Sequence, residues 1–153
     1  MAGTNPDRAP PPLRHSALAA FLVLAACGGH DQPVPGDAND HRPWQGIAAN
    51  EAIQFVGTEP FWGGHVEDGS LTYTTPERPE GETISVSRFA GRGGLSFSGD
   101  MAGASLVLAI TPGKCSDTMS DRTFPFVATL QIGDETRRGC AWSTAHPFEG
   151  GEG

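Results

Sequence analysis

The residues best suited to chemistry lie in two short segments, and each segment contains at least one carboxylate. In the first segment, Glu59 stands close to Phe61 and Trp62. A carboxylate beside large aromatic side chains can have a raised pKa, as a general acid requires. Glycoside hydrolysis also needs a second carboxylate at a suitable spacing, and no residue of the sequence stands out as that partner. We therefore expect Phe61 and Trp62 to be divided between the core and the mouth of a β-structure, with Glu59 capping a turn.

The second segment, residues 115–125, contains Asp117 and Asp121 among serine residues. Carboxylate and hydroxyl oxygens are ligands that hard cations require. The same side chains also bond nearby backbone N–H groups and stabilise irregular turns, and this is the interpretation we favour. Arg122 would then neutralise the acidic cluster. We predict no metal ion and no cofactor.

The sequence offers few other groups for catalysis or for nucleic-acid binding. It has no G-x-S-x-G, H-E-x-x-H or P-loop pattern and no paired C-x-x-C. The formal charge is −8, and ten basic residues are scattered among eighteen acidic ones, which disfavours phosphate binding. The only basic pair, Arg137 with Arg138, is typical of a solvated strand end. We therefore expect a binding protein rather than an enzyme, with no nucleic-acid partner.

Short strands must position these residues, because 21 glycines and 13 prolines in 153 residues disfavour long helices. Short apolar or alternating runs are broken by turn residues, and residues 76–81 read as a polar loop. About eight such strands fit an all-β fold, either a small antiparallel barrel or, as an alternative that the sequence does not separate, a two-sheet sandwich. The expected strands are residues 53–56, 61–66, 71–74, 83–89, 95–98, 105–110, 126–132 and 136–142.

The N-terminal residues predict export. Ten apolar residues, Ala17 to Ala26, follow a basic flank and end at Cys27, which is typical of a secretory signal peptide over residues 1–26. The run is shorter than the roughly 20 residues that span a bilayer. Leu24-Ala25-Ala26-Cys27 resembles the lipobox of bacterial lipoproteins, which implies a lipid on Cys27. The alternative is an ordinary signal peptide that is cut near Ala26.

The residue after Cys27 is Gly28, which in such lipoproteins implies the outer membrane, facing the periplasm or the cell surface. Residues 27–50 are rich in Gly, Pro, Asp and Asn and predict a flexible tether, with Trp44 as a stray aromatic. The barrel domain is expected over residues 51–143, and residues 144–153 are expected to form a disordered tail.

The number of cysteines agrees with a lipid on Cys27. The chain has three, so one disulfide leaves one cysteine over, and an odd cysteine in an exported protein needs an explanation. If Cys27 carries the lipid, Cys115 and Cys140 remain as a pair in an oxidising compartment. They would close a loop of about 26 residues, which stabilises the domain by roughly 3.5 kcal/mol in the chain-entropy model.

Three segments, taken together, resemble a family of uncharacterised bacterial envelope lipoproteins. Members of that family have a G-T-E-P-F-W segment, then C-S-D-G-M-S-D-R-x-Y-P, then G-C-A, and this chain has these segments in the same order. It departs from the family in having Thr118 where glycine is usual and Phe124 where tyrosine is usual. The resemblance implies an envelope compartment and a β-fold more than it implies an activity. The matching segments are residues 57–62, 115–125 and 139–141.

The leading hypothesis for function is a non-enzymatic module that binds a small apolar or amphiphilic molecule, or a cell-wall component, at the barrel mouth. The alternative is an inhibitor of c-type lysozyme, because the chain is similar in plan to the membrane-bound inhibitors of that enzyme, and an acidic domain associates quickly with a basic one. If both hypotheses fail, the remaining one is a structural envelope protein with no soluble ligand. The residues expected to contact a ligand are Glu59, Phe61, Trp62, Tyr73, Asp117, Asp121, Arg122 and Trp142.

Overall fold

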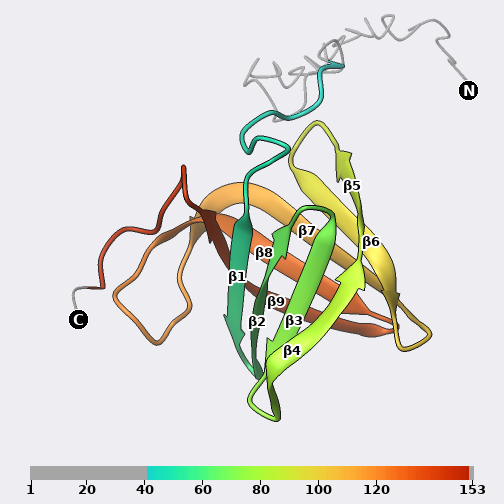
Figure 1. Ribbon diagram of the computed structural model, residues 1–153. Coiled ribbons are helices and arrows are strands. Elements are labelled where there is room, and N and C mark those ends of the chain that lie inside the picture. The colour runs from blue at the N-terminus through green and yellow to red at the C-terminus, as the bar shows by residue number, and fades with distance from the viewer. Residues whose placement is uncertain (1–40, 152–153) are drawn as a thin grey trace, which may run out of the picture. The chain divides into compact units, whose positions relative to one another are not determined.

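The computed structural model describes residues 41–151, which belong to one compact unit and form a single antiparallel β-sheet (Figure 1). The prediction of an all-β fold is confirmed. Within these residues no helix is long and apolar enough to span a membrane. The described strands are β1 (Ile53–Thr58), β2 (Phe61–Glu67), β3 (Ser70–Thr75), β4 (Arg78–Ser85), β5 (Ser87–Ala90), β6 (Leu95–Met101), β7 (Ala104–Cys115), β8 (Phe124–Ile132) and β9 (Glu135–Ser143).

The sheet curls into a nearly closed barrel. The strand order is β4-β3-β2-β1-β9-β8-β7-β6-β5, so the two end strands are neighbours in the chain and only Val86 separates them. One continuous run of chain therefore pairs with β3 along its first part and with β6 along its second. The amide of Val86 donates a 2.8 Å hydrogen bond to the carbonyl oxygen of Gly69 at this transition. A single barrel-shaped sheet is thus confirmed, and its closure leaves little exposed edge.

Two strand predictions around this closure are wrong. Residues 76–81 were expected to form a polar loop, but β4 already begins at Arg78. Residues 83–89 were expected to form one strand, but they divide between β4 and β5. The polar composition misleads because most side chains of β4 point to solvent, so backbone pairing with β3 decides the conformation rather than apolar burial.

The side chains that point inward, every second residue along a strand, fill the barrel and form its core. Leu106, Leu108 and Ile110 of β7 are fully buried, and their neighbours in sequence are not, as a period of two requires. Leu130 of β8 lies opposite Leu108 in the pairing of the two strands. The stretch that the sequence marks as most apolar is therefore at the centre of the core.

Residues 44–50 belong to the barrel domain, and the prediction that they form part of a flexible tether is wrong. Trp44 donates its backbone N–H to the carbonyl of Gly91 at 2.7 Å, and its ring packs edge-on against Phe126. Ile47 is 1% exposed, and its carbonyl accepts a hydrogen bond from Arg88. This segment covers one end of the barrel (Figure 1). The predicted signal peptide, Cys27 and the tether up to residue 40 lie outside the described residues.

The C-terminal segment is also ordered as far as residue 151, so the prediction of a disordered tail is wrong for residues 144–151. Glu149 and Thr123 exchange two backbone hydrogen bonds, of 2.8 and 2.9 Å. The Phe148 ring packs on Trp142, with centroids 5.6 Å apart. Aromatic packing was not expected from a segment so rich in glycine, and it holds the segment beside the loop between β7 and β8 (Figure 1).

Candidate functional site

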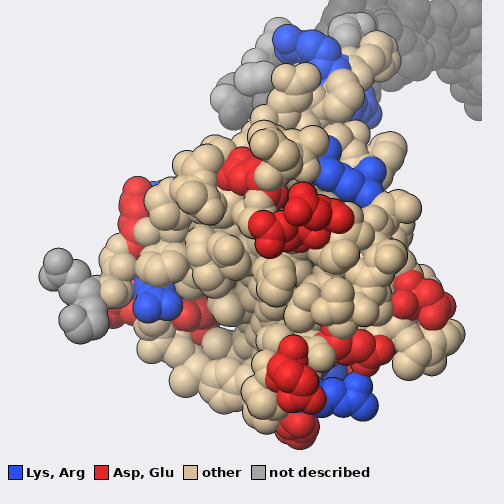
Figure 2. Space-filling view, viewed as in Figure 1, with Lys and Arg blue, Asp and Glu red and all other residues tan. Residues whose placement is uncertain are grey.

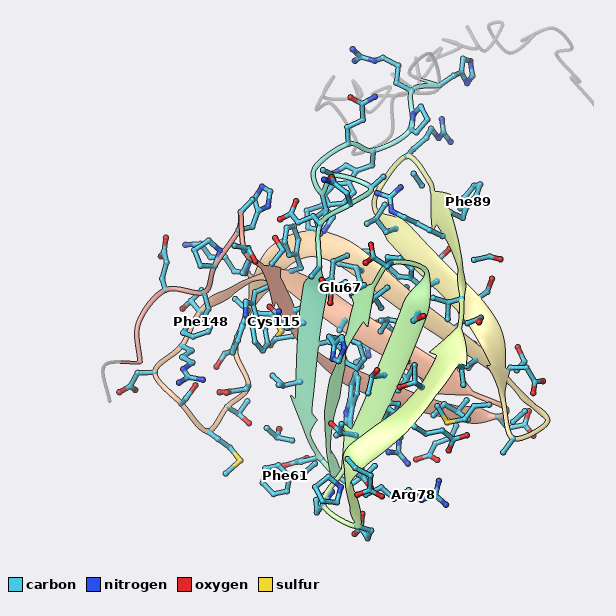
Figure 3. All side chains as sticks on the ribbon, in the orientation of Figure 1. Phe61, Glu67, Arg78, Phe89, Cys115 and Phe148 are labelled. Atoms are coloured by element: carbon cyan, nitrogen blue, oxygen red, sulfur yellow. A yellow bond between two sulfur atoms is a disulfide. The ribbon has the colours of Figure 1, made fainter. Side chains whose placement is uncertain are left out.

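The end of the barrel opposite residues 44–50 opens into a cavity of about 830 Å³, which we call the mouth cavity. Its wall is formed by the turns that join β1 to β2, β3 to β4 and β8 to β9, together with the end of β6. Figure 3 places Phe61 and Arg78 at this end of the molecule, far from Phe89. One end of the barrel is therefore covered and the other is open.

The wall of the mouth cavity is apolar in its depth and charged at its rim. Met101 and Tyr73 are both 8% exposed and form its inner part, with Ile132 beside them. Phe61, at the start of β2, is 52% exposed and stands at the rim. Pro60, in the turn between β1 and β2, contributes a further apolar surface. An amphiphilic molecule would meet both kinds of surface at once.

Arg137 enters the mouth cavity from β9 and organises its polar part. Its guanidinium donates to a carboxylate oxygen of Glu135 from Nε at 2.9 Å and from Nη2 at 2.8 Å, and donates from Nη1 to the Tyr73 hydroxyl. The bond to Glu135 raises the pKa of Arg137. Burial raises the pKa of the Tyr73 hydroxyl, and the positive charge of Arg137 opposes that rise only in part.

Arg137 is a site residue that the sequence does not predict, because a basic pair is typical of a solvated strand end. The alternation of inward-facing and outward-facing residues along β9 is the sequence feature that distinguishes Arg137 from Arg138. Arg137 has the same parity in β9 as the fully buried Ala141, whereas Arg138 has the opposite parity and is exposed. A basic residue on the inward face near a strand end indicates a polar group that must find a partner inside the mouth.

At the rim, further charged groups surround the opening. Arg78 and Glu82 form an ion pair at 2.9 Å, with Arg78 largely exposed. Glu77 accepts hydrogen bonds from its own backbone N–H and from the Thr75 hydroxyl, which lower the pKa of its carboxyl. Glu59 also lines the cavity. Figure 2 shows acidic and basic side chains gathered at this lower end of the domain, beside the turn between β3 and β4.

The three segments that carry the family resemblance meet on one side of the barrel. The predicted disulfide is confirmed: Cys115 and Cys140 are bonded, with their Cα atoms 5.5 Å apart. The Thr58 hydroxyl donates to the carbonyl of Asp117 at 3.2 Å. The loop after β7 is therefore attached both to β9 and to the end of β1. A groove of about 440 Å³ lies between this loop and the outer face of the barrel.

Trp62 lies in the core and not in the mouth cavity. It is 4% exposed and packs between Phe55 and Tyr73, with ring centroids 5.6 and 6.5 Å away. Its indole covers Gly57, where an added Cβ atom would lie 1.9 Å from the indole nitrogen. At Gly139 an added Cβ would lie 2.0 Å from a carbonyl oxygen and 3.0 Å from the indole. Because glycine has no Cβ atom, both positions leave room for the indole of Trp62.

Asp117 stabilises the loop between β7 and β8 rather than the mouth. One of its carboxylate oxygens accepts hydrogen bonds from the amides of Met119, at 3.1 Å, and Ser120, at 2.9 Å. The bond from the Ser120 amide contributes most to lowering the pKa of Asp117. Asp121 lies exposed in the same loop. Among residues 41–151 no group of three or more His, Cys, Asp and Glu side chains could hold a metal ion.

Arg122 and Trp142 lie outside the mouth cavity, which corrects their predicted place at a ligand. The Arg122 guanidinium lies 4.5 Å above the ring of Phe148. Trp142 packs against Phe124 and Phe148 in an aromatic cluster on the outer side of the barrel. Its parity in β9 is opposite to that of Arg137, so the two side chains leave the strand on opposite faces.

Of the eight predicted ligand contacts, the structure thus brings Glu59, Phe61 and Tyr73 to the mouth cavity. Comparisons of the chain with protein-family models, with curated proteins and with solved structures found no match. The resemblance to envelope lipoproteins and the alternative of a lysozyme inhibitor therefore stay predictions. The function must be inferred from the geometry of the site.

Proposed function

We propose that this protein is a lipid-anchored envelope protein whose barrel binds a small amphiphilic molecule in the mouth cavity. The observation that carries the proposal is the asymmetry of the barrel, covered at one end by residues 44–50 and open at the other into about 830 Å³. Small-molecule sites commonly have volumes of about 300–1,000 Å³, and small barrels hold ligands at their mouths.

The polar groups of the cavity favour binding over catalysis. The charged group that reaches deepest, Arg137, is held by Glu135 and by the Tyr73 hydroxyl. The bond from Arg137 lowers the pKa of the Glu135 carboxyl, and the pKa of Glu77 is also lowered. A general acid or base works best with a pKa near the operating pH, and both carboxyls are shifted away from it. These two carboxyls are therefore better suited to orienting a ligand than to exchanging protons with it.

The anchoring part of the proposal rests on the sequence alone, because residues 1–40 lie outside the described part of the chain. Its support is the apolar run that ends at Cys27 and the confirmed disulfide between Cys115 and Cys140. Disulfides persist in oxidising compartments such as the bacterial periplasm. Mass spectrometry of the chain isolated from membranes tests the anchor, and an N-terminal peptide with an unmodified Cys27 would refute it.

Methyl NMR tests the binding part of the proposal on residues 28–153, which include every described strand and both disulfide cysteines. We expect neutral octyl glucoside, kept below its micelle concentration, to shift the methyl signals of Met101 and Ile132. The signals of Ile47, at the covered end, and of Met119, exposed on the loop, serve as controls. Shifts at the controls alone, or at no methyl group, would refute binding of this neutral amphiphile in the mouth cavity, and the proposal fails if cationic and anionic octyl amphiphiles give the same result.

A further inference from the structure

The mouth cavity contains more negative than positive charge. Four carboxylates and two guanidinium groups line it, which leaves a formal charge of −2. Charge lining a cleft with low-dielectric walls concentrates the electric field and attracts ligands of the opposite sign. The four carboxylates are those of Glu59, Glu77, Glu82 and Glu135, and the two guanidinium groups are those of Arg78 and Arg137.

Both guanidinium groups already have a carboxylate partner. Arg78 pairs with Glu82 at 2.9 Å, and Arg137 pairs with Glu135 at 2.8 Å. An anionic head group would have to compete with these intramolecular partners. The negative excess therefore resides on the two remaining carboxylates, which take no part in the ion pairs found within residues 41–151.

Those two carboxylates, Glu59 and Glu77, lie in two of the turns that border the opening, and an exposed aromatic ring stands near them. Glu59 belongs to the turn between β1 and β2, and Glu77 to the turn between β3 and β4. Phe61 follows Glu59 by two residues and is 52% exposed at the same rim (Figure 3). Aromatic faces attract cations, and quaternary ammonium ligands are recognised in this way. Carboxylate and aromatic groups at the rim thus favour a positive head group.

We propose that the ligand of the mouth cavity is a cationic amphiphile, an alkyl chain that ends in an ammonium group. The ammonium group lies at the rim between Glu59 and Glu77, and the alkyl chain packs against Met101 and Ile132. This inference rests on the proposed function, because it concerns the same cavity, and it adds the charge of the ligand. An anionic amphiphile meets the carboxylates of Glu59 and Glu77 at the entrance, both outside the ion pairs, and is repelled, although the charge of Arg137 also acts on Glu77.

The test compares three amphiphiles with the same octyl chain: octyltrimethylammonium, octyl glucoside and octyl sulfate, each below its micelle concentration. Binding to residues 28–153 is followed by the methyl signals of Met101 and Ile132. We expect octyltrimethylammonium to bind most tightly and octyl sulfate most weakly. We also expect added salt to weaken the binding of the cation and to leave that of octyl glucoside unchanged.

Two variants locate the charge effect. Glu59→Gln and Glu77→Gln each remove one rim carboxylate while keeping its size, and each should weaken octyltrimethylammonium binding by roughly 2- to 5-fold, the range for exposed ion pairs. Octyl glucoside binding should not change. Glu67→Gln serves as the matched control, because Glu67 is an exposed carboxylate at the opposite end of β2 (Figure 3).

The outcomes separate the two proposals. If octyl glucoside or octyl sulfate binds as tightly as octyltrimethylammonium, the cavity binds amphiphiles but the inference about charge is wrong. If none of the three shifts the Met101 and Ile132 signals, the proposed function fails and this inference fails with it. If the variants weaken octyl glucoside as much as the cation, the rim carboxylates have a structural role and the inference about charge is again wrong.

Discussion

Replacing Glu51 with alanine tests whether the segment that covers one end of the barrel is part of the folded domain. The side chain of Glu51 is 12% exposed. One of its carboxylate oxygens accepts hydrogen bonds from the Ser143 hydroxyl and, at 3.2 Å, from the amide of Ala145. The other accepts from the amide of Ala48 at 3.2 Å. Glu51 thereby joins the N-terminal segment to the end of β9 and to the C-terminal segment.

The expected loss of stability follows from how well water can replace each bond. Ser143 is fully buried, so its hydroxyl loses its contact with Glu51 and keeps only the longer one to His146 Nδ1, at 3.3 Å, which costs about 1–3 kcal/mol. Ala48 and Ala145 are exposed, so water can solvate their amides and each adds about 0.5 kcal/mol. We therefore expect Glu51→Ala to lower the free energy of unfolding by about 2–4 kcal/mol.

The same contacts predict a pH dependence. Burial by itself raises the pKa of the Glu51 carboxyl, but hydrogen bonds from Ser143, Ala48, Ala145 and His146 outweigh burial and lower it. A carboxyl whose pKa is lower in the folded state stabilises the fold above its unfolded pKa, which is about 4.3. That stabilisation is lost as the pH falls through the folded pKa. Acid should therefore reduce the stability of the wild type more than that of the variant.

Urea denaturation of residues 28–153, followed by tryptophan fluorescence at neutral and acidic pH, measures both effects. Glu51→Gln keeps one acceptor oxygen and should fall between the wild type and Glu51→Ala. Glu80→Ala removes an exposed carboxylate from β4 and should leave the free energy of unfolding within about 0.5 kcal/mol. A Glu51→Ala variant as stable as the wild type would show that the N-terminal segment does not pack on the barrel.

Two further predictions concern the packing beside the mouth cavity. Gly57→Ala should lower the free energy of unfolding by about 1–3 kcal/mol in urea denaturation, because its Cβ atom would lie 1.9 Å from the Trp62 indole nitrogen. Gly93→Ala, where an added Cβ meets nothing within 4 Å, is the control, and equal effects of the two substitutions would contradict the placement of Trp62. Tyr73 is the only tyrosine of the chain, so ultraviolet absorbance titration should report its raised pKa directly. Arg137→Gln should raise that pKa further, because it removes the charge that favours the tyrosinate, and an unchanged or lower pKa would refute the contact between Arg137 and Tyr73.

The candidate site was predictable only in part. Glu59 and Phe61 are in the mouth cavity because they lie in and beside a turn, and local turn signals place turn residues at the end of a barrel. Trp142 was expected beside them because it is aromatic, but its position in β9 turns it to the outer face. Arg137 was missed because a charged residue is usually solvated, and only its inward parity and its contact with Tyr73 show otherwise.

Local sequence patterns suffice for the features that depend on near neighbours in the chain. Alternating apolar residues and turn residues every few positions determine an all-β fold, since a strand exposes successive side chains on opposite faces. The number of cysteines sufficed to pair Cys115 with Cys140 once Cys27 was set aside. These inferences need no knowledge of which strands are adjacent.

Which distant segments meet becomes evident in the folded barrel alone. The run from Arg78 to Ala90 closes the barrel because it contains both end strands of the sheet, although the polar composition of residues 78–81 indicates a loop. Trp44 and Ile47 become part of the core because the barrel has an uncovered apolar end for them to fill. The contact between Tyr73 and Arg137 spans 64 residues of sequence. Such contacts depend on the order of the strands in the sheet, in which β1 pairs with β9 although the two lie far apart in the chain.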